Sequence, residues 1–210
     1  MPYTAAALAP GGHLIDIAVL ASGSGTNLQA LIDTPAVRPH IAVVISDNPD
    51  APALQRARDA GIPQRVVPWP GRAGRDAFSV EVAEAVEESG AKGVVLAGFM
   101  RIVSKSFIDR FPHRILNIHP SLLPAFPGAN AVENALAHSV KLTGVTVHFV
   151  DEGVDSGPIV AQVPVVVFPE DTIATLHRRI QIEEHRLLPA IVEALIEGRL
   201  DVVGRTVVHR

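Results

Sequence analysis

The chain contains no cysteine, which excludes disulfide bonds, thiolate metal ligands and a cysteine nucleophile. Positive charge is also scarce, because lysine occurs only three times in 210 residues and the formal net charge is −4. Proteins that bind nucleic acid usually carry a stripe of basic side chains, so we expect no nucleic-acid partner. A chain without cysteine fits a reducing compartment, and we expect the protein in the cytoplasm.

Long apolar runs are absent as well. No stretch reaches the roughly 20 apolar residues that a membrane-spanning helix needs, so we expect no membrane partner. Residues 1–13 lack the basic start and the long apolar centre of a signal peptide. They are predicted to form a flexible extension before the first strand.

Hydrophobic residues make up 48% of the chain, enough for one α/β domain with a sizeable core, predicted over residues 14–210. Up to residue 118, short apolar runs alternate with helical patterns. This alternation is typical of a mostly parallel central sheet with helices on both faces. Strands are predicted at residues 14–20, 41–45, 64–67, 93–97 and 115–118, and helices at residues 25–33, 52–60, 75–89 and 104–110.

The pattern changes in the C-terminal part. Residues 143–150 and 159–167 are predicted to be two strands separated only by a turn, which favours antiparallel strands added at the edge of the sheet. A long helix is predicted from about residue 172 to 197, where Gly198 supplies a C-terminal stop signal. Residues 202–208 are predicted to form a last short strand.

A glycine-rich segment, Ser22-Gly-Ser-Gly-Thr-Asn27, joins the first predicted strand to the first helix. Backbone N–H groups at the start of a helix can bind anions. The segment fails as a dinucleotide-binding fingerprint, because Leu28 stands where the third glycine is required. Thr26 and Asn27 add side-chain donors, which favours a monophosphate over a pyrophosphate. A tight turn capped by Thr26 or Asn27 explains the segment equally well.

Two polar loops follow apolar strands later in the chain. Asn117 and His119 lie in N-I-H-P-S-L-L-P, residues 117–124, and Asp155 lies in V-D-E-G-V-D-S-G-P, residues 150–158. An amide can donate to a developing oxyanion, an imidazole can carry charge near neutral pH, and a carboxylate can tune that imidazole. Together these groups are suited to transfer of an acyl-type group without a covalent nucleophile.

Each of these residues also has an ordinary interpretation. Taken alone, His119 is a loop histidine bonded to the backbone, and Asp155 is a turn residue. Asp151, Asp155 and His119 could instead bind a metal, but their spacing matches no known metal loop, so no metal is expected. Ser121 lacks the G-x-S-x-G context of a nucleophilic serine. Both loops follow strands at the edge where α/β proteins bind ligands, which favours the catalytic interpretation.

The two motifs, together with A-G-F-M-R-I at residues 97–102, resemble the glycinamide ribonucleotide formyltransferases over about residues 17–204. The resemblance implies a Rossmann-like formyltransferase fold and an enzyme of de novo purine synthesis. It further implies that the substrate's free amine attacks the formyl carbon of 10-formyltetrahydrofolate. Asn117 and protonated His119 would stabilise the oxyanion, Asp155 would tune His119, and both substrates would be small molecules.

The same resemblance assigns the ligand contacts. The substrate's phosphate would lie on Gly25, Thr26 and Asn27, and its ribose near Gln181 and Glu184. The folate would contact Arg75, Met100, Arg101, Ile102, Val103 and Asn117. From the residues alone, Arg75 and Arg101 are more simply solvated arginines, and Gln181 and Glu184 are a polar pair beside the apolar stripe of the long helix.

The chain departs from the family at Asn130 and Val132, where the family often has histidine, and at Thr26, where serine is common. Two related enzymes share the chemistry. Methionyl-tRNA formyltransferase has an added C-terminal domain, and formyltetrahydrofolate deformylase usually has an N-terminal regulatory domain; neither is expected here. A non-enzymatic nucleotide-binding module would keep the glycine segment without needing Asn117, His119 and Asp155 together. A homodimer is compatible with the sequence.

Overall fold

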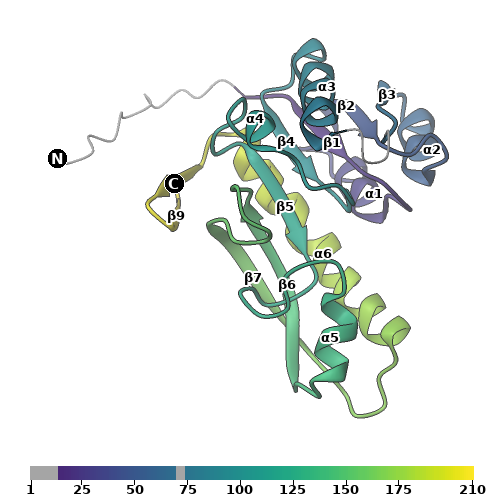
Figure 1. Cartoon of the computed structure of the whole chain (residues 1–210), viewed down its shortest axis with the longest axis vertical. Helices are drawn as coiled ribbons and strands as arrows, with labels where there is room; N and C mark the ends of the chain where they lie inside the picture. The colour runs from purple at the N-terminus through teal and green to yellow at the C-terminus, as the bar shows by residue number, and fades with distance from the viewer. Residues whose placement is uncertain (1–13, 70–73) are drawn as a thin grey trace.

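The computed structural model describes residues 14–69 and 74–210, so the predicted extension over residues 1–13 lies outside the described residues. As far as β5, strands and helices alternate (Figure 1). The elements are β1 (Ile17–Leu20), α1 (Thr26–Ile32), η1 (Arg38–His40), β2 (Ile41–Ser46), α2 (Pro52–Asp59), β3 (Gln64–Val66), α3 (Arg75–Glu88), β4 (Gly93–Leu96), α4 (Lys105–Ile108) and β5 (Ile115–His119).

The remaining elements are α5 (Ala131–Ala137), β6 (Leu142–Phe149), β7 (Ile159–Val166), α6 (Ile173–Ile196), β8 (Leu200–Val203) and β9 (Thr206–His209). Seven strands form one sheet in the order β3-β2-β1-β4-β5-β6-β7. The strands from β3 to β5 are parallel, whereas β6 and β7 are antiparallel additions. The predicted mostly parallel sheet with antiparallel edge strands is therefore confirmed.

Helices cover both faces of the sheet, as predicted, because successive side chains of a strand point to opposite faces. Ile17 and Val19 of β1 belong to a core with residues of α1, α2 and α6. Ala18 and Leu20 belong to a second core with residues of α3 and α4. Figure 1 shows α6 running along the sheet past β5 towards the far ends of β6 and β7. Among the described residues, no helix combines the length and hydrophobicity needed to cross a membrane.

The predicted long helix is confirmed within one residue at each end. Thr172 caps its start, exchanging hydrogen bonds with Thr175, and Gly198 follows its end with a φ of 66°. The predicted single strand over residues 202–208 is wrong, because the segment folds into the antiparallel hairpin of β8 and β9. Gly204, with a φ of 63°, makes the turn, and a residue with a side chain rarely adopts that conformation. The predicted first strand is also shorter, beginning at Ile17.

The strand order places a potential ligand site between β1 and β4. From β1 the chain moves outward through β2 and β3, and then returns to β4 on the other side of β1. Ligands of open α/β sheets bind beyond the carboxyl ends of the strands at such a switch point. The glycine segment after β1, the Met100 loop after β4 and the end of β5 all lie at this edge.

Candidate active site

Asn117 and His119 point to the same face of the sheet because they are two residues apart on β5. The neighbouring strand β6 pairs His148 with Asn117 and Thr146 with His119. His119 and His148 are buried, at 5% and 2% exposure. The register between β5 and β6 therefore gathers an amide, two imidazoles and a hydroxyl on one side of the sheet.

Asp155 reaches this group from the turn between β6 and β7. Its φ of 51° is unusual for a residue with a side chain, although aspartate tolerates this conformation better than most residues. Oδ1 accepts a hydrogen bond from Nδ2 of Asn117 at 3.3 Å, and Oδ2 accepts one from the backbone N–H of Gly128 at 2.8 Å. Oδ2 also lies 3.3 Å from Nδ1 of His119. The structure thus brings the three predicted catalytic residues together.

His119 faces a hydrogen-bond acceptor at each ring nitrogen. Nδ1 faces the Asp155 carboxylate, and Nε2 lies 2.8 Å from the carbonyl oxygen of Phe126. A doubly protonated imidazole carries two donors and satisfies both contacts at once. A histidine that is simply bonded to the backbone explains the contact with the Phe126 carbonyl but not the contact with Asp155.

His148 is a functional candidate that the sequence argument missed. Its Nε2 lies 3.1 Å from Nδ2 of Asn117 and 3.6 Å from Oδ1 of Asp155. A neutral ring can accept a hydrogen bond from Asn117, whereas a protonated ring can donate one to Asp155. The available signal was a histidine within the apolar strand Thr143–Val150, but its neighbours depend on strand register.

The charge of Asp155 is strongly stabilised. Burial alone would raise the pKa of its carboxyl, but the His148 ring, the Gly128 N–H and the nearby His119 act in the opposite direction. Together they hold the pKa of Asp155 at about 2. Asp155 is therefore an anion over the whole range in which an enzyme is normally assayed.

Replacing His148 by leucine is expected to raise the pKa of Asp155, because the imidazole 3.6 Å from Oδ1 no longer stabilises the carboxylate. Without the His148 ring, Asp155 should also move relative to His119. This change of position should lower kcat by roughly ten- to a hundredfold. Carboxyl chemical shifts followed through an acid titration measure the first effect. His209→Leu is the matched control, since His209 is exposed on β9 and its Nε2 faces the Val160 carbonyl oxygen at 3.5 Å. An unchanged Asp155 titration in His148→Leu would contradict this account.

The candidate metal site does not form. Asp151 turns back on its own loop, where its Oδ1 accepts hydrogen bonds from Ser156 Oγ at 2.6 Å and from the Gly153 N–H at 3.1 Å. In residues 14–69 and 74–210, no group of three or more histidine and acidic side chains could hold a metal ion. Ser121 is fully buried and donates to the carbonyl of Ala125 at 2.5 Å, which leaves it no nucleophilic role.

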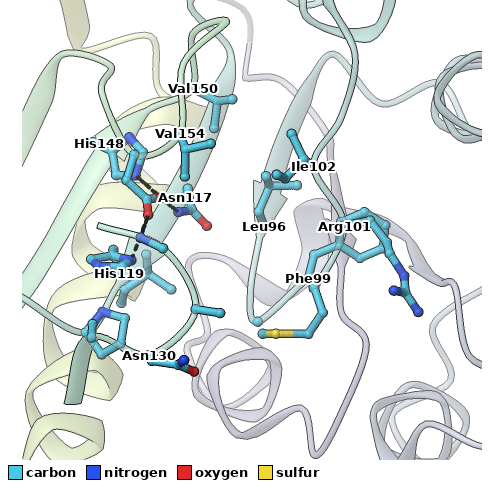
Figure 2. Close-up of a pocket in the computed structure, with 18 of the residues that line it drawn as sticks. Leu96, Phe99, Arg101, Ile102, Asn117, His119, Asn130, His148, Val150 and Val154 are labelled. Carbon is cyan, nitrogen blue, oxygen red and sulfur yellow. Dashed lines mark hydrogen bonds and ion pairs between the residues drawn. The ribbon is translucent and has the colours of Figure 1, made fainter. Parts of the chain in front are cut away.

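A pocket of about 540 Å³ opens beside these residues. Figure 2 shows Asn117, His119 and His148 on one side of it, and Leu96, Phe99 and Ile102 on the other. Further lining comes from residues 128–133, residues 150–155 and His177 of α6. A mostly apolar pocket with a few polar groups converging at one end is typical of a small-molecule site.

The glycine segment lies at the carboxyl end of β1. Gly25 has a φ of 69° and directly precedes α1, so Thr26 is the first helical residue. The side chain of Asn27 is buried and points to α6, where its Nδ2 donates to Oε2 of Glu184 at 3.0 Å. Burial raises the pKa of Glu184, although the bond from Asn27 partly opposes this. Two residues predicted to bind the same substrate are thus in direct contact.

The predicted folate contacts are only partly brought together. Met100, Arg101, Ile102, Val103 and Asn117 line the pocket. The guanidinium of Arg101, however, is turned away from the cavity towards Asp47 (Figure 2). Arg75 is exposed as the first residue of α3 and is not among the lining residues, and neither are Gln181 and Glu184. Asn130 and Val132 do line the pocket, so the departures from the family pattern lie at its wall.

Comparisons with known proteins find relatives over most of the chain. The formyl transferase family matches residues 15–192. Phosphoribosylglycinamide formyltransferase of Mycobacterium tuberculosis (strain ATCC 25618 / H37Rv) is 46% identical over 192 residues, covering 90% of this chain and 89% of that protein. Trifunctional purine biosynthetic protein adenosine-3 of Bos taurus is 45% identical over 194 residues, which are 90% of this chain but only 19% of the bovine protein.

A solved structure is similar over nearly its whole length. Glycinamide ribonucleotide transformylase 1 from Symbiobacterium toebii superimposes with a TM-score of 0.89 at 50% sequence identity, covering 94% of this chain and 95% of that one. The family match extends over most of the chain and includes β5, β6 and the turn that carries Asp155. On this evidence the chain belongs to the formyl transferase family.

Proposed function

We propose that this chain transfers the formyl group of 10-formyltetrahydrofolate to the amine of 5′-phosphoribosylglycinamide, a step of de novo purine synthesis. The observation that carries the proposal is the contact of Asn117, His119 and Asp155 at the polar end of the apolar pocket. These groups can stabilise charge but offer no covalent nucleophile, so the substrate's own amine attacks. The similarity to the M. tuberculosis enzyme supports this choice of substrates.

In the proposed reaction, the amine nitrogen forms a bond to the formyl carbon and the formyl oxygen becomes an oxyanion. Asn117 and protonated His119 donate hydrogen bonds to that oxygen. The Asp155 carboxylate, 3.3 Å from Nδ1, favours the charged ring by Coulomb attraction. The intermediate then collapses as the bond from carbon to N10 breaks, which releases tetrahydrofolate.

Asp155 is expected to act by its charge rather than as the final proton acceptor. A general base works best when its pKa lies near the operating pH. With a pKa of about 2, Asp155 holds a proton too weakly for that task. The proton of the attacking amine therefore passes to water or to the departing nitrogen.

The two donors already have partners where they lie. Nδ2 of Asn117 faces Asp155 and His148, and Nε2 of His119 faces the Phe126 carbonyl. Each donor must give up or share one of these contacts to bind an oxyanion. The donors therefore gain most from this change of partner when the formyl oxygen becomes negatively charged.

The parts of the two ligands are assigned to the groups that suit them, some of which lie outside the lining of the pocket. We place the phosphate on the backbone N–H groups of Gly25, Thr26 and Asn27, because the side chain of Asn27 is engaged by Glu184. Gln181 and Glu184 lie one and two turns beyond the lining residue His177 on α6, where they could reach the ribose. The pterin lies against the loop Met100–Val103, and Arg75 is kept as a proposed contact of its outer part.

The direct test mixes the protein with 10-formyltetrahydrofolate and follows deformylation with and without 5′-phosphoribosylglycinamide after exhaustive treatment with EDTA. We expect rapid deformylation only when the ribonucleotide is present, and the rate should survive chelation because no step uses a metal. Deformylation that ignores the ribonucleotide would indicate a deformylase instead. Activity that is lost to EDTA and restored by a divalent ion would overturn the mechanism.

The low pKa of Asp155 predicts a specific dependence of stability on pH. An aspartate in an unfolded chain has a pKa of about 3.9, so folding that lowers the pKa gains stability above that pH. This gain is lost as the pH falls from about 4 towards 2. At pH 5 we expect wild type and Asp155→Asn to differ in free energy of unfolding by the full contribution of the charged Asp155. Below pH 4 the difference should shrink; a constant difference down to pH 2 would contradict the low pKa.

Three further assignments complete the proposal. Residues 14–210 act as one formyltransferase domain, and the reaction takes place in the cytoplasm. The substrates are small molecules, and the homodimer that the sequence allows can be tested by sedimentation equilibrium.

A further inference from the structure

Arg101 lies in the pocket wall, but its charged end does not face the pocket. Its neighbours Met100 and Ile102 are 67% and 56% exposed and line the cavity. Nε of the guanidinium instead lies 2.6 Å from Oδ2 of Asp47. Its Cζ lies over the Trp69 ring, 4.9 Å from the ring centre. Figure 2 shows this group directed away from Asn117 and His119.

Asp47 and Trp69, the two partners of the Arg101 side chain, are themselves held by other residues. Asp47 directly follows β2, and only 1% of its side chain is exposed. Its carbonyl accepts a hydrogen bond from the Trp69 N–H at 3.3 Å. The Trp69 ring meets Phe78 of α3 edge to face at 4.8 Å, and Phe78 stacks on the pocket residue Phe99. The guanidinium therefore lies between a buried carboxylate and an aromatic ring.

The loop is held at two other points by neutral contacts. The Met100 N–H donates to Oγ of Ser22 at 2.8 Å, and the Ser104 N–H donates to Oγ of Ser79 at 3.0 Å. The ion pair lies between these anchors, at the residues that shape the pocket. A buried carboxylate strongly favours a cationic partner, so the pair restricts where the Arg101 backbone can lie.

We propose that Asp47 is a positioning residue for the formyl donor: acting through Arg101, it holds the loop Met100–Val103 in the shape that receives the pterin. This inference rests on the proposed function, because it takes the folate to be the ligand of that loop. The charge of Arg101 is engaged by Asp47 rather than by the ligand. Arg101 contributes its backbone and its fixed place in the wall.

The test replaces Asp47 by asparagine, which keeps the size of the side chain and removes its charge. We expect KM for 10-formyltetrahydrofolate to rise about tenfold, while kcat and KM for the ribonucleotide change less than about twofold. Arg101→Lys should raise the donor KM as well, because lysine keeps the charge but lacks the planar group that stacks on Trp69. Calorimetry with tetrahydrofolate should show the same loss of affinity.

Asp109→Asn is the matched control, since Asp109 pairs with Lys105 just beyond the loop while both side chains are exposed. It should leave both KM values unchanged. In Asp47→Asn/Arg101→Met the donor KM should equal that of Arg101→Met alone, because Asp47 acts through Arg101.

Three results would overturn the inference. A lower donor KM in Asp47→Asn would mean that Asp47 keeps Arg101 away from a ligand that it binds directly. Equal rises in both KM values, together with a lower melting temperature, would mean a general structural role. A failure of the wild-type protein to bind tetrahydrofolate would mean that the folate is not the ligand of the loop Met100–Val103. If wild type binds tetrahydrofolate but transfers no formyl group, the proposed function fails, and the calorimetric comparison still decides the role of Asp47.

Discussion

His119→Asn is expected to lower kcat by about a thousandfold, and Asp155→Asn by about a hundredfold or more. Asparagine cannot carry the positive charge that faces the developing oxyanion, and the Asp155 variant loses the anion 3.3 Å from the ring. Binding of either substrate should change little, because these contacts strengthen only as the oxyanion forms. Single-turnover rates and calorimetric dissociation constants measure the two effects separately.

The coupling between the two residues gives a sharper result. If Asp155 acts largely through His119, the double variant should be barely slower than His119→Asn alone. A double variant as slow as the product of the two single effects would show that Asp155 acts independently. His209→Asn is the control for loss of an imidazole, since His209 is exposed on β9 and is not among the residues that line the pocket.

Gly25→Ala is expected to raise KM for 5′-phosphoribosylglycinamide by at least about tenfold and to leave the donor KM nearly unchanged. A Cβ at this position would lie 2.8 Å from both Cα and Cβ of Ala53, so the glycine segment or α2 must shift. The N–H groups that we assign to the phosphate belong to this segment, whereas the folate loop follows another strand. Steady-state kinetics with each substrate varied in turn measures the separation.

Gly61→Ala separates the steric effect from backbone strain. Gly61 has a φ of 71°, almost the same as the 69° of Gly25, but a Cβ there would meet nothing within 4 Å. Both variants should lose roughly 1 kcal/mol of stability from the left-handed conformation, and only Gly25→Ala should lose substrate affinity. Equal losses for both substrates in Gly25→Ala would count against the phosphate assignment.

The sequence was sufficient where the signal is local or repeats along the chain. Alternating apolar runs predicted the parallel strands, and two apolar runs joined by a turn predicted β6 and β7. Asn117 and His119 could be anticipated together because they lie two residues apart on one strand. Asp155 follows β6, which runs antiparallel to β5, so the rule that parallel strands end at a common edge does not explain its place beside them. The prediction of one last strand over residues 202–208 was wrong because Gly204 turns the chain there and makes a hairpin.

Contacts between distant segments were not predictable in this way. His148 is next to Asn117 only because β5 and β6 pair in one particular register. Asn27 was expected to face a phosphate, but its side chain finds Glu184 on a helix 157 residues later in the chain. The direction of Arg101 depends on Asp47, a buried carboxylate that needs a cation. Such choices are made by tertiary packing and charge pairing, which leave no periodic pattern in the sequence.

The division of the site between two kinds of strand has a consequence for partial unfolding. Asn117 and His119 belong to the parallel body of the sheet, whereas His148 and Asp155 belong to the antiparallel hairpin at its margin. Terminal strands usually open at a lower free energy than central ones. A brief release of β6 and β7 would separate the anion from the imidazole while β1 to β5 stay paired. Catalysis would then cease reversibly without global denaturation, and residual activity would report on the attachment of this hairpin rather than on the fold as a whole.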